Sequence, residues 1–164
     1  KTGWEGRYYE DFEVGDVYRS RFGRTVTEVD NLLFTHLTLN TNPLHFDARY
    51  TGQSKWGQIL VNSTFTLALV VGMSVPDVSE NAIANLGWEE VKLPHPVFVG
   101  DTLYCETEVL AKRESKSYSE AGIVKVWSRG INQDGKVVID FVRSIMIYKR
   151  GRSPRKDLFP DIDM

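Results

Sequence analysis

The segment LTLNTNPLHFDARY, residues 37–50, places two asparagines, a proline and a histidine within six positions. His45 is the one titratable side chain of this short motif, and its unperturbed pKa near neutrality suits proton transfer. The amide of Asn40 cannot exchange a proton, but it can orient a water molecule. Asn42 and Pro43 restrict the backbone before the histidine, so that the imidazole points in one direction. These residues predict an active site with His45 and Asn40 as the catalytic groups.

The same residue types also have purely structural interpretations. An isolated histidine most often fills a loop, and asparagine in the position of Asn40 is common at a helix C-terminus, where it tolerates a left-handed backbone. His36 is expected in the core because it lies on the apolar side of a helical pattern, and His95 is interpreted as a turn residue between two prolines. Three histidines and one cysteine without metal-ligand spacing predict no metal site.

A helix is predicted immediately before the motif. Apolar residues recur at helical spacing between positions 29 and 37. Thr27 with Asp30 resembles a capping box, which marks the first turn of this helix. Because Pro43 pushes the residue before it out of the helical region, the helix should end near Asn40.

Two further helices are predicted after the motif. Residues 47–57 form a short amphipathic helix opened by Asp47 and closed by Gly57. Residues 59–75 are apolar on nearly every side and carry no charge, which is typical of a buried central helix. Polar residues at the start of this segment leave an apolar run too short to cross a membrane. Asn62 or Ser63 is well suited to cap its first turn.

The C-terminal half is dominated by strand patterns. A short strand is predicted at Arg24–Val26, and residues 103–109 alternate between two faces. Residues 122–149 contain two β-branched, aromatic-rich runs joined by Asn132–Gly135, which predicts a hairpin. An antiparallel sheet needs a cover for its apolar face, and one wholly apolar helix supplies it. The predicted fold is α+β: a hot-dog fold, with a curved antiparallel sheet wrapped round one long buried helix.

Length and composition predict one ordinary globular domain. The chain has 164 residues, of which 41% are hydrophobic and 26% charged. We assign residues 1–148 to the domain and residues 149–164 to a charged C-terminal extension. A net charge of -2 gives no sign of nucleic-acid binding. The single cysteine, Cys105, cannot form an intrachain disulfide, and no signal peptide is visible, so we expect a cytoplasmic protein without a membrane anchor.

Three stretches carry a family resemblance: NTNPLHFDARY at 40–50, WGQILVNSTFTLAL at 56–69 and LPHPVFVGDTLYCETEVL at 93–110. In this order they resemble the MaoC-like, (R)-specific enoyl-CoA hydratase family, and the resemblance extends from about Tyr8 to Tyr148. The finer pattern, LTLNTNPLHFD with NLGWEEVKLPHPVFVGDTL, is similar to the branch that hydrates C5 dicarboxylyl-CoA thioesters such as mesaconyl-CoA and itaconyl-CoA.

The resemblance implies a lyase that adds water across the double bond of an α,β-unsaturated acyl-CoA thioester. It implies no separate cofactor, because CoA is part of the substrate. The family has an Asp where this chain has Asn40, so the proton-transfer role is carried over to His45 and Asn40 is left to orient water. The family pattern places the thioester oxygen at the backbone N–H groups near Asn62 and Ser63, and Asn42 is counted with these substrate-binding residues.

Three cations flank the motif and are candidates to pair with a substrate carboxylate: Arg24, Arg49 and Lys55. Arg24 and Arg49 are the two to test first. A thioesterase is one alternative function, but hot-dog thioesterases need a carboxylate on or beside the central helix, and residues 59–75 contain none. A non-catalytic acyl-CoA-binding protein is the other alternative, because Asn40 replaces the expected acid. The long strands leave a sheet edge open, which predicts a homodimer or a higher homo-oligomer with its site at the shared groove.

Overall fold

The computed structural model describes residues 3–163. In chain order its strands and α-helices are β1 (Val17–Arg19), β2 (Arg24–Thr25), α1 (Glu28–Leu37), α2 (Ala48–Thr51), α3 (Ser63–Ser74), β3 (Ala82–Lys92), β4 (Thr102–Glu114), β5 (Ala121–Ile131) and β6 (Val137–Tyr148). Short 3-10 turns occur at Tyr9–Asp11 and Pro43–His45, and a π-helix at Val75–Ser79 continues α3.

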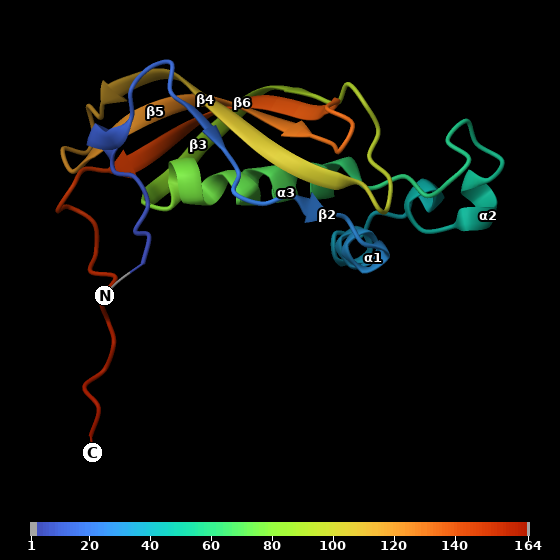
Figure 1. The fold of residues 1–164 in the computed structure, drawn as a ribbon, viewed down its shortest axis with the longest axis horizontal. Helices are drawn as coiled ribbons and strands as arrows, with labels where there is room; N and C mark the ends of the chain where they lie inside the picture. The colour runs from blue at the N-terminus through green and yellow to red at the C-terminus, as the bar shows by residue number, and fades with distance from the viewer. Residues whose placement is uncertain (1–2, 164) are drawn as a thin grey trace.

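The strands form a curved antiparallel sheet that lies over α3 (Figure 1). The strand order is β1-β4-β5-β6-β3, and β2 pairs with the start of β4. The predicted hairpin turn between β5 and β6 is confirmed, since the side-chain oxygen of Asn132 accepts hydrogen bonds from the N–H groups of Asp134 and Lys136, both at 3.0 Å. Gly135 supplies the left-handed backbone of this turn, with φ 75°. The predicted α+β architecture of a sheet over one central helix is therefore present.

Apolar side chains fill the space between the sheet and α3. Val70 of α3, Leu103 of β4 and Phe141 of β6 belong to one buried cluster. Phe12 and Ile145 belong to a second cluster under the N-terminal segment. Each such side chain contributes roughly 1.5–3 kcal/mol when fully buried, and these contacts fix the position of the helix against the sheet.

Helix α3 is covered on one side only. Thr66, Val70 and Ser74 face the sheet and are buried. Ala68 and Gly72 lie on the opposite side and are exposed. In Figure 1 the blue segment that leads to β2 runs along the lower side of the helix, and no further layer of helices or strands covers it. A groove of about 790 Å³ follows this open side. The uniformly apolar sequence predicts that every side of α3 is buried. In the structure only the side that faces the sheet is buried.

Strand β3 is one edge of the sheet, opposite the short edge strand β1, and the sequence pattern does not predict it. Its sequence AIANLGWEEVK has no regular alternation, and polar residues and a glycine interrupt it. Its pairing with β6 contains three register shifts along 11 residues. Leu86, Trp88 and Val91 are each between 45% and 49% exposed along this strand. The structure thus leaves an irregular, partly apolar strand at the sheet edge.

Helix α1 turns its polar side inward. Its buried residues are Asn31 and Thr35, whereas Val29, Leu33 and Leu37 are exposed by 65–76%. The predicted core position of His36 is wrong: the side chain is exposed, and the centroid of its tilted ring lies 5.1 Å from that of Phe46. The periodicity identifies the apolar stripe of α1 correctly. However, the opposite, polar stripe is the one that faces the interior of the protein.

The capping box at Thr27 and Asp30 is confirmed, since each side chain accepts a hydrogen bond from the other residue's backbone N–H. Helix α1 ends at Leu37, and Leu39 adopts the left-handed conformation with φ 57°. The backbone N–H of Asn40 reaches back to the carbonyl of Thr35 at 3.0 Å, which is the bonding of a Schellman motif. Leu39, rather than Asn40, is therefore the left-handed residue of the helix end.

The short helix α2 is opened by Asp47, as expected, because the Asp47 carboxylate accepts from the N–H of Tyr50 at 2.9 Å. It ends at Thr51 rather than near Gly57. Gly52 follows directly, and the hydroxyl of Ser54 donates to the carbonyl of Thr51 at 2.8 Å. This local hydrogen bond competes with helix continuation.

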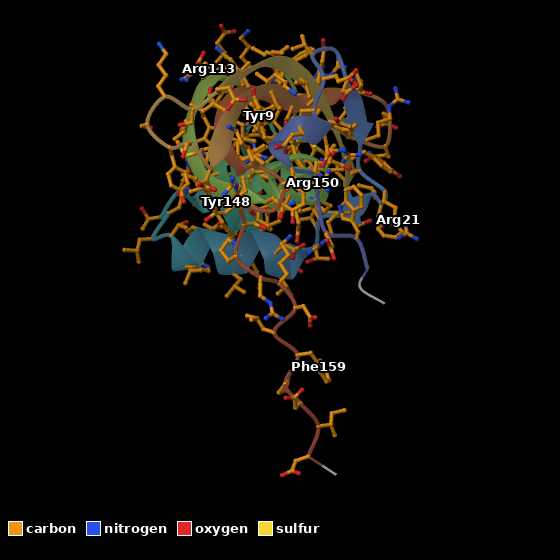
Figure 2. All side chains as sticks on the ribbon, turned by 90° about the vertical axis from the view of Figure 1, so that its left-hand side faces the viewer. Tyr9, Arg21, Arg113, Tyr148, Arg150 and Phe159 are labelled. Atoms are coloured by element: carbon orange, nitrogen blue, oxygen red, sulfur yellow. The ribbon has the colours of Figure 1, made fainter. Side chains whose placement is uncertain are left out.

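The segment after Tyr148 contains no helix or strand up to residue 163. Its first part lies against the N-terminal segment, where Arg150 pairs with Asp11 and Lys156 donates to the carbonyl of Glu5 at 2.7 Å. Figure 2 shows Phe159 on a tail that extends away from the rest of the molecule. Among residues 3–163 no helix has the length and apolarity needed to cross a bilayer.

Candidate active site

The turn that carries His45 is shaped by two asparagine side chains. The side-chain oxygen of Asn40 accepts from the N–H of Asn42 at 3.0 Å. The side-chain oxygen of Asn42 accepts from the N–H of Leu44 at 3.1 Å, and Pro43 occupies the first position of the 3-10 turn. Asn42 therefore caps the turn in this structure. The nitrogen Nδ2 of half-buried Asn40 has no hydrogen-bond partner among the described residues and remains available to a water molecule.

The imidazole of His45 is held in one tautomer. Its Nδ1 lies 2.8 Å from the carbonyl oxygen of Leu60, and because a carbonyl only accepts, Nδ1 carries the proton. The N–H of Leu60 in turn donates to the carbonyl of Leu44 at 3.0 Å. The Nε2 of His45 has no partner among residues 3–163 and is not sealed from solvent, although the residue is only 8% exposed. In the neutral ring Nε2 is therefore the nitrogen without a proton, and it can accept one from a bound molecule.

A buried amide that the sequence analysis missed joins this turn to α3. Asn31 of α1 is 0% exposed. Its nitrogen donates to the backbone carbonyl of His45 at 2.8 Å, and its oxygen accepts from the backbone N–H of Asn62 at 3.0 Å. Asn62 also donates from its side chain to the hydroxyl of Thr35 at 3.3 Å. The sequence does contain a signal for this buried contact: Asn31 and Thr35 are polar residues four positions apart, opposite the apolar stripe of α1.

The N-terminus of α3 presents one side to solvent. Asn62 is its N-cap and accepts from the N–H of Thr64 at 3.0 Å. The N–H of Asn62 is already bonded to Asn31, so it is not open to a ligand. The N–H of exposed Ser63 has no partner among the described residues, and it lies at the positive end of a 12-residue helix. Ser63 therefore offers the open backbone donor at this helix end.

The two candidate cations have different surroundings. Arg24 makes a two-pronged ion pair with Asp30, at 2.9 and 2.8 Å, and this pair lowers the pKa of Asp30 to about 2. Arg24 also lines the groove beside the second half of α3, beyond the end that carries Asn62. Arg49 is exposed on α2, and its guanidinium has no ion pair or hydrogen bond within the described part of the chain. Arg49 is therefore the cation that a ligand can engage without displacing a carboxylate.

The structure brings His45, Asn40, Asn62 and Ser63 to one end of α3, where hydrogen bonds join the turn at 40–45, helix α1 and the start of α3. A protonatable nitrogen, a side-chain amide and a helix N-terminus together can move a proton, hold a water molecule and stabilise an oxyanion. Within residues 3–163 no group of three or more His, Cys, Asp and Glu side chains is placed to hold a metal ion.

Residues 11–128 match the family model described as "MaoC like domain". The chain belongs to the MaoC-like domain family. A mesaconyl-CoA hydratase of Cereibacter sphaeroides is 35% identical over 145 residues, which are 88% of this chain and 42% of that protein. The chain thus spans about two fifths of the length of this curated MaoC-like relative.

Solved structures share the fold of this domain. A MaoC domain protein from Chloroflexus aurantiacus, titled a putative dehydratase, superposes with a TM-score of 0.87 at 31% identity, covering 99% of this chain and 47% of the other. A Mycobacterium tuberculosis protein titled as having a double hot-dog fold superposes with a TM-score of 0.80 at 21% identity, covering 96% and 47%. The predicted hot-dog fold of this MaoC-like domain is confirmed.

Proposed function

We propose that this MaoC-like domain hydrates the double bond of an α,β-unsaturated acyl-CoA thioester, and catalyses the reverse dehydration. The observation that carries the proposal is the His45 ring, whose Nδ1 is bonded to the Leu60 carbonyl while Nε2 remains free. Supporting it, the C. sphaeroides relative is named a mesaconyl-CoA hydratase. The reaction needs no cofactor beyond the CoA of the substrate.

In the proposed reaction Nε2 of His45 takes a proton from water while the water oxygen bonds to Cβ of the substrate. The electron pair of the double bond moves towards the thioester, and the negative charge develops on its oxygen. The open N–H of Ser63 and the helix dipole of α3 stabilise that charge. The imidazolium then returns its proton to Cα, so that one water molecule has been added and His45 is neutral again.

Asn40 has the supporting role in this scheme. Its side-chain oxygen is occupied by the N–H of Asn42, whereas its Nδ2 is open. An amide N–H can donate to the oxygen of the attacking water, but it cannot take the proton. We therefore assign water orientation to Asn40 and proton transfer to His45 alone.

We further propose a branched C5 dicarboxylyl group, as in mesaconyl-CoA or itaconyl-CoA, for the acyl part of the substrate. The name of the C. sphaeroides relative supports this choice. A second carboxylate needs a cation near the reacting carbons, and Arg49 is exposed and unpaired within the described residues. Arg24 is the weaker candidate, because it already holds Asp30.

Two alternatives are judged against the same geometry. A non-catalytic acyl-CoA-binding domain is favoured by one observation, the presence of Asn40 where the family signature has an acid. Thioester hydrolysis lacks the carboxylate that hot-dog thioesterases need on the central helix, since α3 contains no Asp or Glu. The first acid after α3 is Asp77, which lies in the π-helix at the opposite end of α3 and pairs with Arg7 of the N-terminal segment.

The hydratase proposal predicts that the chain bleaches the enoyl-thioester absorbance of crotonyl-CoA or mesaconyl-CoA. The absorbance falls because hydration removes the double bond conjugated with the thioester carbonyl. Liberated thiol, measured in parallel, should stay at the background level, which separates hydration from hydrolysis. Saturable binding of mesaconyl-CoA with unchanged absorbance would instead support the non-catalytic alternative.

We also propose that the domain works as a homodimer or a multiple of it, in the cytoplasm. Within residues 3–163 neither the open side of α3 nor the exposed edge β3 has a cover. Covering an apolar helix side on each of two units is a strong driving force for association. Light scattering at micromolar concentration is expected to give at least twice the chain mass of 18.7 kDa. A mass near 18.7 kDa would contradict the dimer.

A further inference from the structure

We infer that Asn31 is a positioning residue that holds the His45 turn at a fixed place relative to the N-terminus of α3. The inference rests on the proposed function and deepens it. Asn31 contacts the site through backbone atoms only: the carbonyl of His45 at 2.8 Å and the N–H of Asn62 at 3.0 Å. It therefore acts through other residues and touches no reacting atom.

The geometry explains why an amide is needed at this position. The carbonyl of His45 requires a donor, and the N–H of Asn62 requires an acceptor, so a side chain with one of each satisfies both. Asn31 is completely buried, and a buried polar group without a partner is costly. A carboxylate or an apolar side chain would leave at least one of the two backbone groups unpaired.

The side of α1 that carries Asn31 is also hydrogen-bonded to Asn40. Thr35, four residues after Asn31, accepts from the side chain of Asn62 through its hydroxyl and from the N–H of Asn40 through its carbonyl. Asn31 and Thr35 are both 0% exposed. One polar stripe of α1 thus connects the proton-transfer group, the water-orienting amide and the helix N-terminus.

The decisive variant is Asn31→Leu, which keeps the approximate volume and removes both hydrogen bonds. Displacing a catalytic group by about 1 Å can cost about a hundredfold, and a loosened turn should lower kcat roughly tenfold with KM within about twofold. Asn81→Leu is the matched control, because Asn81 is also buried and its side chain donates at 3.0 Å to the carbonyls of Glu5 and Arg7. The control should lose stability while keeping kcat. A kcat within about twofold of the unmodified protein for Asn31→Leu would overturn the inference.

A second variant keeps the inference testable if Asn31→Leu fails to fold. Asn31→Asp retains the acceptor for Asn62, and its carboxyl donates to the His45 carbonyl only when protonated. Burial raises the pKa of a carboxyl, so the ratio of variant to unmodified kcat should rise as the pH falls from about 8 to about 6. A ratio that is independent of pH would count against positioning through the His45 carbonyl.

The last measurement does not depend on activity. In the unmodified protein, nitrogen NMR should show His45 with its proton on Nδ1, as the bond to Leu60 requires. An Asn31 variant should show a mixture of tautomers, and an unchanged single tautomer would overturn the inference. If the unmodified protein is inactive on every enoyl-CoA tested, the proposed hydratase function fails, and the NMR result alone decides the role of Asn31.

Discussion

Replacing His45 by Ala is expected to lower kcat/KM for hydration by about a hundred- to ten-thousand-fold, the usual contribution of general acid-base catalysis. The proposed site contains no second group that can replace it. Asn40 is an amide and Ser63 contributes a backbone N–H, and neither exchanges a proton near neutral pH. The measurement is the initial rate of absorbance loss with mesaconyl-CoA and with crotonyl-CoA.

His95→Ala is a matched control for this result. The Nδ1 of His95 also bonds to a backbone carbonyl at 2.8 Å, that of Val137, but the residue is exposed and lies outside the site. The control should keep full activity. Circular dichroism should show that His45→Ala retains its secondary structure. If the folded His45→Ala protein keeps kcat/KM within about twofold, His45 has no part in proton transfer.

Replacing Arg49 by Leu is expected to remove a ten- to hundredfold preference for mesaconyl-CoA over crotonyl-CoA. A partly desolvated hydrogen bond between a guanidinium and a carboxylate contributes roughly 1.5–3 kcal/mol, and each 1.4 kcal/mol corresponds to about tenfold. Only mesaconyl-CoA carries the second carboxylate, so the kcat/KM for crotonyl-CoA should change little. The measurement is the ratio of the two kcat/KM values before and after the substitution.

Arg24→Leu is the comparison variant for Arg49. Arg24 is bonded to Asp30, which caps α1, so its loss should weaken the start of that helix and lower both rates in similar proportion. A preference that disappears with Arg24→Leu and survives Arg49→Leu would move the carboxylate site to the other arginine. Equal kcat/KM values for the two thioesters in the unmodified protein would end the dicarboxylate proposal.

The parts of the fold that follow from local chemistry are predictable from the sequence. The capping box at Thr27 depends on residues three positions apart, and the hairpin turn at Asn132–Gly135 depends on four consecutive residues. The turn that carries His45 is also local, because Asn42 caps it and Pro43 occupies its first position. Such features need no knowledge of the rest of the chain.

The features that the sequence does not predict depend on distant partners. Strand β3 has a weak strand pattern of its own and exists because β6 pairs with it. Asn31 looks like an ordinary polar residue on a surface helix until the His45 turn and Asn62 are placed on either side of it. The orientation of α1 follows from the same bonds, because the polar stripe satisfies buried backbone groups that an apolar stripe cannot.

The three register shifts of β3 determine which molecules can join the sheet. An edge strand meets the edges of many other proteins in a crowded cell, and a regular one would accept almost any extended chain. In β3 the shifts interrupt the row of available N–H and C=O groups, and Glu90 has a left-handed backbone with φ 52°. Only a partner whose own irregularities fall opposite these positions can form a continuous ladder. The uneven edge therefore protects the protein from indiscriminate aggregation while leaving a matching edge able to bind.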